Sequence, residues 1–238
     1  MSFLEGTEEA KELAARNADF ELNERNENTY KYLDRVITED RVTDSSNLSS
    51  DEQLNGIDSS EKATWVPIEK GFRQSDLYYK SKVEYINWSK ESLQEIQSHR
   101  NGILKNVDYY FEPGVFISRG GFANLRARYT NNRAIDATGS ILVPTDPQKL
   151  SVKYLTGILN SEVPIHITEN FINSTGIETA DLRLIPIPIP SEEQRESVET
   201  LVDRAIEVQQ GNRSESLESI QTEIEEIVEQ IYQVDLDE

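Results

Sequence analysis

The sequence predicts an α+β fold, in which a mixed β-sheet domain is followed by a C-terminal antiparallel helical hairpin. Short apolar and aromatic runs bounded by glycine and proline, such as WVPIEKG and YYFEPGVFISRGG, are typical of strands in the middle of the chain. Prolines at 186, 188 and 190 force an extended segment, because each also restricts the residue before it. Behind that segment, apolar residues recur at helical spacing in two blocks separated by Gly211-Asn212, which predicts two packed helices.

Residues 1–61 are predicted to form an acidic N-terminal segment and a linker. TEEAKELAARN, residues 7–17, is typical of a short helix with acids in its first turn, and residues 20–37 carry a weaker helical pattern. From Thr43 to Ser60, serine, aspartate and asparagine dominate and few residues are apolar. That composition favours a linker or a disordered join.

Residues 62–190 are predicted to contain the sheet. Ser81–Trp88 alternates as a strand does, and Ser89 then caps the helix SKESLQEIQSHR. The aromatic runs on either side of Pro113-Gly114 predict a hairpin, and residues 134–143 predict one more strand. Ser151 opens the helix VKYLTGILNS, which we expect to bury Tyr154, Leu155, Ile158 and Leu159.

Residues 191–238 are predicted to form the helical hairpin. Ser191 and Gln194 make a capping box at the start of its first helix. The apolar positions expected to face inward are Val198, Leu201, Val202, Ala205 and Ile206 in the first helix, and Leu217, Ile220, Ile224, Ile227 and Ile231 in the second. Spacings that alternate between three and four residues are those of a coiled-coil seam.

The charge of the chain is unevenly distributed. The formal net charge is -20, yet residues 62–160 hold 14 lysines and arginines against 9 acids, whereas residues 1–61 hold 6 against 16 and residues 161–238 hold 4 against 19. Within the basic middle, FISRGGFANLRARYTNNR contains four arginines and no acid. A basic segment in so acidic a chain indicates a polyanionic partner, and double-stranded DNA is the first candidate.

Composition excludes several other classes of protein. The chain has no cysteine, hence no disulfide framework and no thiolate metal site, and no apolar run approaches the length of a membrane helix. We therefore expect a protein of the cytoplasm without a membrane partner. The excess of carboxylates favours adaptation to high salt, with an ordinary protein with acidic ends as the alternative. In concentrated salt, DNA recognition would depend more on base contacts than on counterion release.

The order of these features resembles a known arrangement. WVPIEKG, YINWSKES, YYFEPGVFISRGG, the DATGS strand, YLTGILNS and IPIPIPSEEQ, followed by a helical hairpin, resemble the C-terminal target-recognition region of adenine-N6 DNA methylases of restriction–modification and BREX-type phage-exclusion systems. The IPIPIPSEEQRESVETLV piece is also similar to the junction between recognition domain and spacer helix in type I specificity subunits. The resemblance covers roughly residues 60–238, and YLTGILNS and IPIPIPSEEQ are its most specific parts.

The resemblance implies a module that reads a short DNA sequence for a methylase that uses S-adenosylmethionine. Such methylases carry an Asn/Asp-Pro-Pro-Tyr/Phe tetrapeptide that holds a flipped adenine, and this chain contains no Pro-Pro pair and no cofactor-binding glycine loop. We therefore expect no catalytic residue and no cofactor in this chain. The resemblance also implies that the C-terminal helices dock on a methylase or restriction subunit, which would supply both.

The candidate DNA-binding residues are those whose side chains suit phosphate or base edges. Arginine can form paired hydrogen bonds to guanine or clamp a phosphate, lysine contacts phosphate, and asparagine can read a base edge. They are Arg119, Arg126, Arg128, Arg133, Asn124, Asn131, Lys70, Lys80 and Lys82. The competing interpretation is that these cations pair with acids of the same chain.

Other potential sites carry weaker signals. His99 and His166 are the only histidines and lack metal-ligand spacing, and the Gly120-Gly121 pair lacks the spacing of a nucleotide-binding loop. Two alternatives to the methylase module stay open. One is half of a type I specificity subunit, and the other is an acidic interaction protein that does not bind DNA.

Overall fold

The computed structural model describes residues 39–58, 60–61, 63–71, 76–81, 83–98, 104–118, 125–171 and 176–234. The helices expected over residues 7–17 and 20–37 lie outside these ranges. The chain divides into two compact units, Met1–Pro67 with Tyr85–Ile103, and Ile68–Glu84 with Leu104–Glu238. The sequence-derived segments 1–61, 62–190 and 191–238 stay predictions as functional domains.

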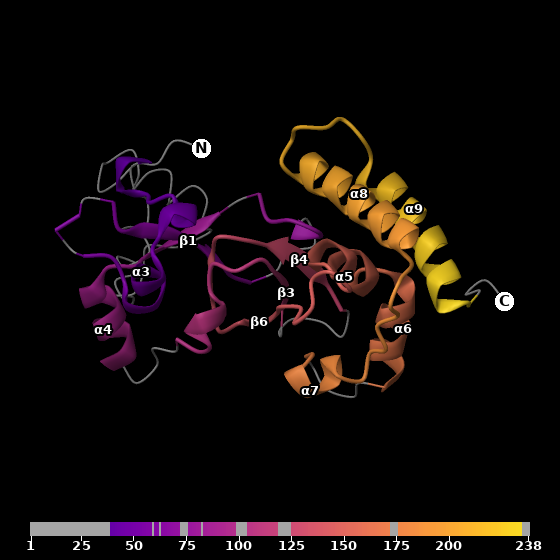
Figure 1. The fold of residues 1–238 in the computed structure, drawn as a ribbon, viewed down its shortest axis with the longest axis horizontal. Coiled ribbons are helices and arrows are strands. Elements are labelled where there is room, and N and C mark those ends of the chain that lie inside the picture. Colours follow the sequence, from indigo (N-terminus) through magenta and orange to yellow (C-terminus); the bar gives the residue numbers. More distant parts are fainter. Residues whose placement is uncertain are drawn as a thin grey trace, which may run out of the picture. The chain divides into compact units, whose positions relative to one another are not determined.

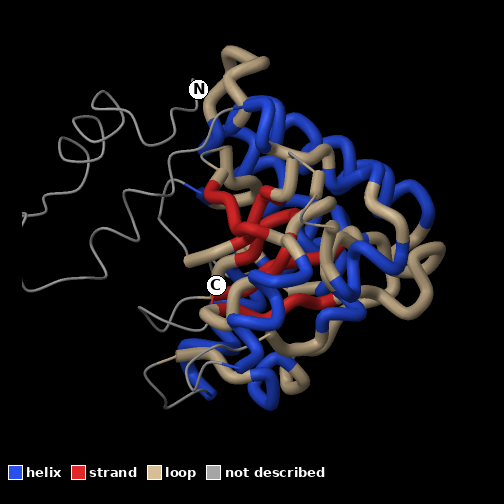
Figure 2. The backbone as a smooth tube through the Cα atoms, turned by 90° about the vertical axis from the view of Figure 1, so that its left-hand side faces the viewer, coloured by secondary structure: helices blue, strands red, loops and turns tan. Residues whose placement is uncertain are grey.

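Helices and strands are both present, which confirms the α+β class (Figure 1). The strands are β1 (Trp65–Glu69), β2 (Glu84–Asn87), β3 (Gly114–Ser118), β4 (Ala127–Thr130), β5 (Ala134–Ile135) and β6 (Gly139–Leu142). The α-helices are α3 (Ser50–Asn55), α4 (Lys90–Ser98), α5 (Val152–Leu159), α6 (Glu162–Phe171), α7 (Thr179–Leu182), α8 (Glu192–Gln209) and α9 (Leu217–Tyr232). Short 3-10 turns lie at Glu39–Arg41, Ser45–Asn47 and Val107–Tyr109. Figure 2 shows the short strands in red among helices and long loops.

The expected linker between Thr43 and Ser60 is folded instead, so that prediction is wrong. Ser49 caps α3 by accepting a hydrogen bond from the Glu52 amide, and the Glu52 carboxylate bonds back to the Ser49 amide. Trp88 is fully buried and donates its indole N–H to the Glu52 carbonyl at 2.9 Å. The serines and acids of this stretch are thus capping residues of a small helix, a role that composition does not distinguish from disorder.

The six strands form two three-stranded sheets, in the orders β2-β1-β5 and β4-β3-β6. The end of β1 runs parallel to β5, and β3 lies antiparallel to both β4 and β6. A hairpin around Pro113-Gly114 is therefore wrong, since β3 begins at Gly114 and pairs with β4. The residues before it turn away, with Phe111 at φ 66° donating its amide to the Arg133 carbonyl.

The single strand expected over residues 134–143 is broken into β5 and β6. The break falls at Asp136, whose carboxylate accepts the Thr138 amide at 2.9 Å. Such an Asx-type turn gives the backbone a local alternative to the ladder. As a result β5 joins one sheet and β6 the other, and this short turn links the two.

Helix α5 buries Tyr154, Leu155, Ile158 and Leu159, as the YLTGILNS pattern predicts, and it lies at the centre of the second unit. Leu155 and Leu159 pack with Val115, Ile117 and Ala127 on one face of sheet β4-β3-β6. The opposite side of the helix meets α8 and α9. All residues from Tyr154 to Leu159 are buried, so the helix is covered by the sheet on one side and the hairpin on the other.

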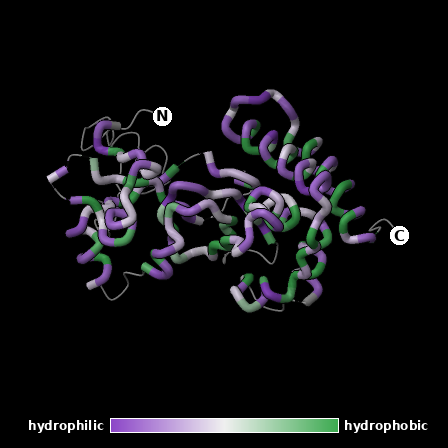
Figure 3. The backbone as a smooth tube through the Cα atoms, viewed as in Figure 1, coloured by the Kyte–Doolittle hydropathy of each residue, from purple (hydrophilic) through white to green (hydrophobic). Residues whose placement is uncertain are grey.

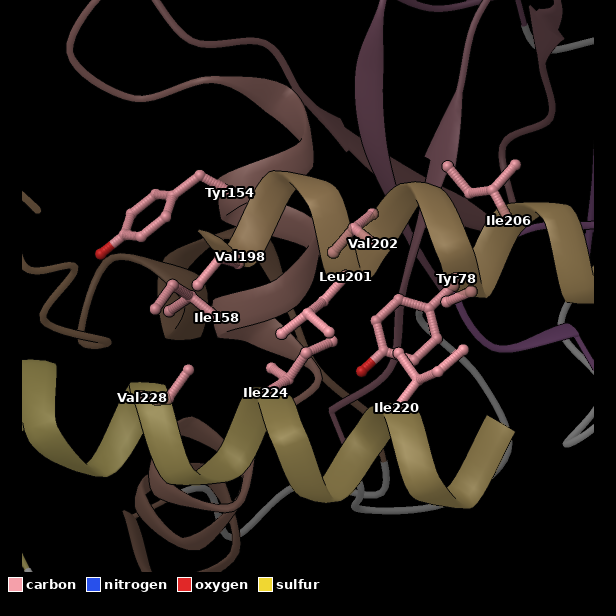
Figure 4. Close-up of a cluster of buried hydrophobic side chains, with 11 residues drawn as sticks. Tyr78, Tyr154, Ile158, Val198, Leu201, Val202, Ile206, Ile220, Ile224 and Val228 are labelled. Atoms are coloured by element: carbon pink, nitrogen blue, oxygen red, sulfur yellow. The ribbon is translucent and has the colours of Figure 1, made fainter. Parts of the chain in front are cut away.

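The C-terminal hairpin is confirmed. Its seam joins α5, α8 and α9 in one apolar cluster. In Figure 4 Ile206 and Ile220 lie towards one end of the two helices, with Tyr78 between them, and Val198 and Val228 lie towards the other, which is the antiparallel arrangement. In Figure 3 apolar and polar residues alternate along both helices. The predicted inward residues of α8 and Ile220 and Ile224 of α9 are buried, as is Val228, while Leu217, Ile227 and Ile231 are half-buried. Gly157 permits the close approach of α5 to α8, because a Cβ there would lie 2.5 Å from Val198 Cγ1.

The proline segment is extended and is held along its length by two tyrosines. Tyr154 of α5 donates its hydroxyl to the Pro188 carbonyl at 3.0 Å, and Tyr232 of α9 donates to the Pro186 carbonyl at 2.7 Å. Ser191 then starts α8 with the predicted capping box. The segment is a stiff connector rather than a strand of either sheet. Helices α6 and α7, which precede it, were not predicted.

Candidate nucleic-acid interface

The structure separates the nine candidate DNA-binding residues into three groups. Arg119, Asn124 and Lys82 lie outside the described residues. Lys70, Arg126 and Asn131 are half-buried. The remaining three, Lys80, Arg128 and Arg133, are buried.

Arg128 is an interior residue. Its side chain is 0% exposed and lies on β4, on the face of the sheet opposite α5, with its guanidinium 4.8 Å from the centre of the Phe116 ring. It forms ion pairs with Glu69 Oε1 at 2.5 Å and with Asp76 Oδ2 at 3.4 Å. Burial lowers the pKa of the Arg128 guanidinium, and the Glu69 and Asp76 carboxylates oppose that shift. Arg128 is therefore paired inside the protein.

Arg133 shares the same carboxylate. Its Nη1 lies 2.8 Å from Glu69 Oε2, its Nη2 donates to the Lys80 carbonyl at 3.1 Å, and the guanidinium is 4.9 Å from the centre of the Tyr79 ring. Arginine suits this role because its planar fork can bond two acceptors and stack on an aromatic face together. Both oxygens of the fully buried Glu69 thus face arginines.

Lys80 completes the group. Its ammonium bonds Glu84 at 2.9 Å and the Lys70 carbonyl at 2.7 Å. We refer to Glu69, Asp76, Lys80, Glu84, Arg128 and Arg133 as the charged cluster. It contains three cations and three anions, of which Glu84 is 55% exposed and the others are largely buried, so each buried charge has a partner of opposite sign.

The prediction that Lys80, Arg128 and Arg133 contact DNA is contradicted by this burial. Their positive charge is neutralised inside the same unit, and their polar atoms are directed at carboxylates and backbone carbonyls. The competing interpretation, pairing with acids of the chain, is correct for these three. It is correct in the interior, however, and not as surface salt bridges with the acidic flanks.

Of the half-buried candidates, Lys70 lies next to the cluster, since its carbonyl accepts hydrogen bonds from Lys80 and Arg128. Arg126 immediately precedes β4, two residues before Arg128. The side chains of Lys70 and Arg126 have no ion-pair or hydrogen-bond partner in the part of the chain that the structure describes. The Asn131 side chain bonds the Tyr129 hydroxyl. Lys70 and Arg126 are thus the described candidates whose charge is available to an anion.

Sequence reasoning missed two other available cations and the residues that orient the site. Lys105 and Arg183 are exposed and likewise without a side-chain partner among the described residues. Gly71 has φ 55° and donates its amide to Thr138 Oγ1 at 3.2 Å, which turns the chain beside Lys70. The glycine itself was a usable signal, since left-handed turns favour it, but the Thr138 contact spans 67 residues and has no local signature.

The described residues contain no group of histidines, aspartates and glutamates that could hold a metal ion. His166 is exposed on α6, and His99 and the Gly120-Gly121 pair lie outside the described ranges. Nor do the helices among them include one of sufficient length and apolarity to cross a bilayer. Compared with known proteins, the chain matches no family model. A search of curated proteins likewise finds no significant match.

Proposed function

We propose that this chain is the sequence-specific DNA recognition module of a restriction–modification or phage-defence adenine-N6 DNA methyltransferase, and that it is non-catalytic by itself. The observation that carries the proposal is that the two most specific motifs of the resemblance, YLTGILNS and IPIPIPSEEQ, contact each other in the fold. Tyr154 of YLTGILNS donates to the Pro188 carbonyl of IPIPIPSEEQ, and Gly157 of the first motif packs on Val198 just beyond the second. Residues far apart in the sequence thus build one joint between sheet and hairpin.

In this proposal the DNA is contacted by cations that are not used inside the fold. Lys70, Arg126 and Asn131 are the described candidates, and Arg119, Asn124 and Lys82 stay candidates from the sequence. Ammonium groups provide phosphate contacts, which position a protein on DNA, whereas arginine and asparagine can also read base edges. The charged cluster lies beneath this surface and does not itself touch DNA.

Catalysis belongs to another chain in this proposal. That chain would bind S-adenosylmethionine and supply the adenine-binding tetrapeptide that is missing here. Helices α8 and α9 are the proposed docking element for it, and a module of this kind acts in the cytoplasm. Half of a type I specificity subunit would use the same joint of sheet, connector and helix.

One observation favours a second candidate, an acidic interaction protein that does not bind DNA. Burial of Lys80, Arg128 and Arg133 removes three of the cations that make the middle of the chain basic. Fewer cations of this region are therefore available to an external anion, although its net charge is unchanged, because the carboxylates that pair with them belong to the same region. The two candidates differ in one measurable property, which is the affinity for duplex DNA.

Fluorescence anisotropy with random-sequence duplex DNA at several salt concentrations tests the proposal. We expect the wild-type chain to bind with a negative slope of log affinity against log salt. Replacing Lys70 and Arg126 together by alanine should reduce that slope by about 2, while leaving the thermal unfolding midpoint unchanged. Lys149→Ala is the matched control, because it removes one positive charge from a side chain that is 67% exposed. Absence of binding at every salt concentration would favour the second candidate.

A selection experiment tests sequence specificity. The wild-type chain is incubated with a random duplex library, and the retained DNA is sequenced. Enrichment of a short common sequence is expected, because specific sites typically bind at least 10³-fold more tightly than non-specific DNA. Retention without enrichment would mean that the chain binds only the DNA backbone.

A further inference from the structure

The turn at Lys70 and Gly71 is held from inside the protein by the charged cluster. Arg128 Nη2 donates to the carbonyls of both residues, at 3.2 Å to Lys70, and Lys80 Nζ donates to the same Lys70 carbonyl at 2.7 Å. From outside, Thr138 Oγ1 accepts the Gly71 amide. Two consecutive peptide groups are therefore fixed by three side chains.

The far end of this segment is fixed by the same cluster. Arg133, which shares Glu69 with Arg128, donates to the Lys80 carbonyl at 3.1 Å. Tyr78 sits at φ 66° and is paired with β4, since the Tyr129 amide donates to its carbonyl at 2.9 Å. Described residues on both sides, Lys70–Gly71 and Asp76–Lys80, are thus bonded to the cluster or to β4.

The side chain of Lys70 is used by none of these contacts. The Lys70 carbonyl is held by hydrogen bonds from Arg128 and Lys80, while the Lys70 ammonium has no partner among the described residues. Arg128 and Lys80 therefore determine the position of the Lys70 backbone from which the side chain extends. A long flexible side chain on a fixed base loses less entropy on binding an anion than one on a loose base. This arrangement suits contact with a phosphate.

We propose that Arg128 is a positioning residue, which acts on DNA phosphate through the carbonyls of Lys70 and Gly71 while remaining buried. The inference rests on the proposed function. Arg128, the most buried described arginine of the basic segment, would then affect DNA binding only through the backbone of Lys70 and Gly71, whereas the sequence alone predicts that it contacts DNA directly. In this proposal Lys70 contacts the phosphate, and Arg128 fixes the position of the Lys70 backbone.

A double-mutant cycle on DNA affinity tests this. Lys70→Ala should weaken duplex binding roughly fivefold at about 0.15 M salt and reduce the salt slope by about 1, the effect of one lost phosphate contact. Arg128→Lys keeps the charge beside Glu69, but its compact ammonium cannot reproduce the fork that reaches two carbonyls. It should therefore lower the affinity and the slope as Lys70→Ala does, and should have no further effect in the Lys70→Ala background.

A second variant avoids the buried cluster, in case Arg128→Lys does not fold. Thr138→Val removes only the hydroxyl that accepts the Gly71 amide from the exposed side, and it should show the same non-additivity with Lys70→Ala in smaller measure. Lys149→Ala serves again as the charge-matched control.

The outcomes separate the inference from the function it rests on. In one outcome the wild-type chain binds DNA and Lys70→Ala weakens the binding, but the affinity losses of Arg128→Lys and Thr138→Val simply add to that of Lys70→Ala. This overturns the positioning role and leaves the proposed function standing. Unchanged binding in Lys70→Ala also overturns it, because Lys70 would then make no contact. If the wild-type chain binds no DNA at any salt, the proposed function and the inference fail together.

Discussion

Sheet β4-β3-β6 has two faces with opposite chemistry. On one, Val115, Ile117 and Ala127 pack against α5 and form an apolar core. On the other, Arg128 lies over Phe116 and pairs with Glu69, within a cluster of ions. Consecutive residues of β4 therefore belong to two different interiors. An arginine in a strand of this protein is therefore not necessarily exposed, as Arg128 shows.

The two interiors respond differently to change. Apolar packing is non-directional, so each lost group costs in proportion to the area and cavity it leaves. A buried ion pair contributes little net stability over an apolar pair. Removing one partner is costly, however, because it leaves the other charge buried with neither water nor a counter-ion. Neutralising a fully buried member of the cluster, Glu69 or Arg128, should thus cost several kcal/mol, while losses on the apolar side should scale with the size of the group removed. Substitutions in both interiors test this difference.

The largest effect is expected for Glu69→Gln. This change removes the one carboxylate shared by Arg128 and Arg133 and should lower the free energy of unfolding by about 3–5 kcal/mol in urea titration. Glu84→Gln is the control, because the Glu84 side chain is 55% exposed, and it should cost less than about 1 kcal/mol. Equal losses for the two variants would mean that the cluster is accessible to water.

On the apolar side, Ile224→Ala should cost about 2–5 kcal/mol, because Ile224 is fully buried in the seam between α8 and α9 and would leave a cavity. Ile189→Ala, at a residue that is 71% exposed, should stay within about 0.5 kcal/mol. Chemical denaturation of both variants provides the comparison. A neutral Ile224→Ala would show that the hairpin does not pack as the structure has it.

Gly157→Ala tests the close approach of α5 and α8. The added methyl group would lie 2.5 Å from Val198 Cγ1, and overpacking of this kind costs about 1–3 kcal/mol, less up to about 1 kcal/mol gained from helix propensity. Val198→Ala should restore part of the loss when combined with Gly157→Ala, although it is destabilising alone. Thermal unfolding of the two single variants and the double variant measures this coupling.

The smallest effect concerns pH. Burial raises the pKa of Glu225, although the Glu162 amide and the Gln221 side chain donate hydrogen bonds to its carboxylate. A carboxyl whose pKa is higher in the folded protein stabilises the fold when protonated, and that contribution is lost as pH rises through the raised pKa. Between about pH 4.5, the ordinary value, and neutrality, the wild type should lose stability relative to Glu225→Gln, by less than about 1 kcal/mol.

Melting curves of both proteins over this pH range, compared as a difference, isolate Glu225 from other carboxylates. That comparison is needed because Arg204 lowers the pKa of Glu215 and Glu223, which has the opposite pH dependence. A difference that does not change with pH would contradict the raised pKa of Glu225.

Local patterns predicted helices α4, α5, α8 and α9, but not α3, α6 or α7. The capping box at Ser191, the spacing of Val198 to Ile206 and the glycine break at Gly211 all act within a few residues of one another. Strand pairing was predicted poorly, because the partner of β3 depends on contacts distant in sequence. The turn at Asp136, which sends β5 and β6 to separate sheets, was mistaken for the interior of one strand.

The candidate site was predicted in part. The sequence predicts that Arg126 and Arg128 share a face if the stretch is extended, but a local pattern does not reveal which of them the fold buries. The structure has Arg128 buried in β4 and Arg126 half-buried just before it. The carboxylate that pairs with Arg133 is 64 residues away, so a regional charge count includes it without revealing the contact. A usable hint was Glu69, an acid that ends the otherwise apolar strand WVPIE beside the buried Ile68.

The central claim, that the basic segment is divided between the interior and the surface, is tested most directly by urea unfolding of Arg128→Ala beside Arg126→Ala. The two variants lose the same side chain at positions two residues apart. Arg128→Ala should lose about 3–5 kcal/mol of unfolding free energy, because Glu69 keeps a buried charge with one partner fewer. Arg126→Ala should stay within about 0.5 kcal/mol of wild type. Small and equal losses of unfolding free energy in the two variants would contradict the claim and would indicate that Arg128 is exposed to solvent.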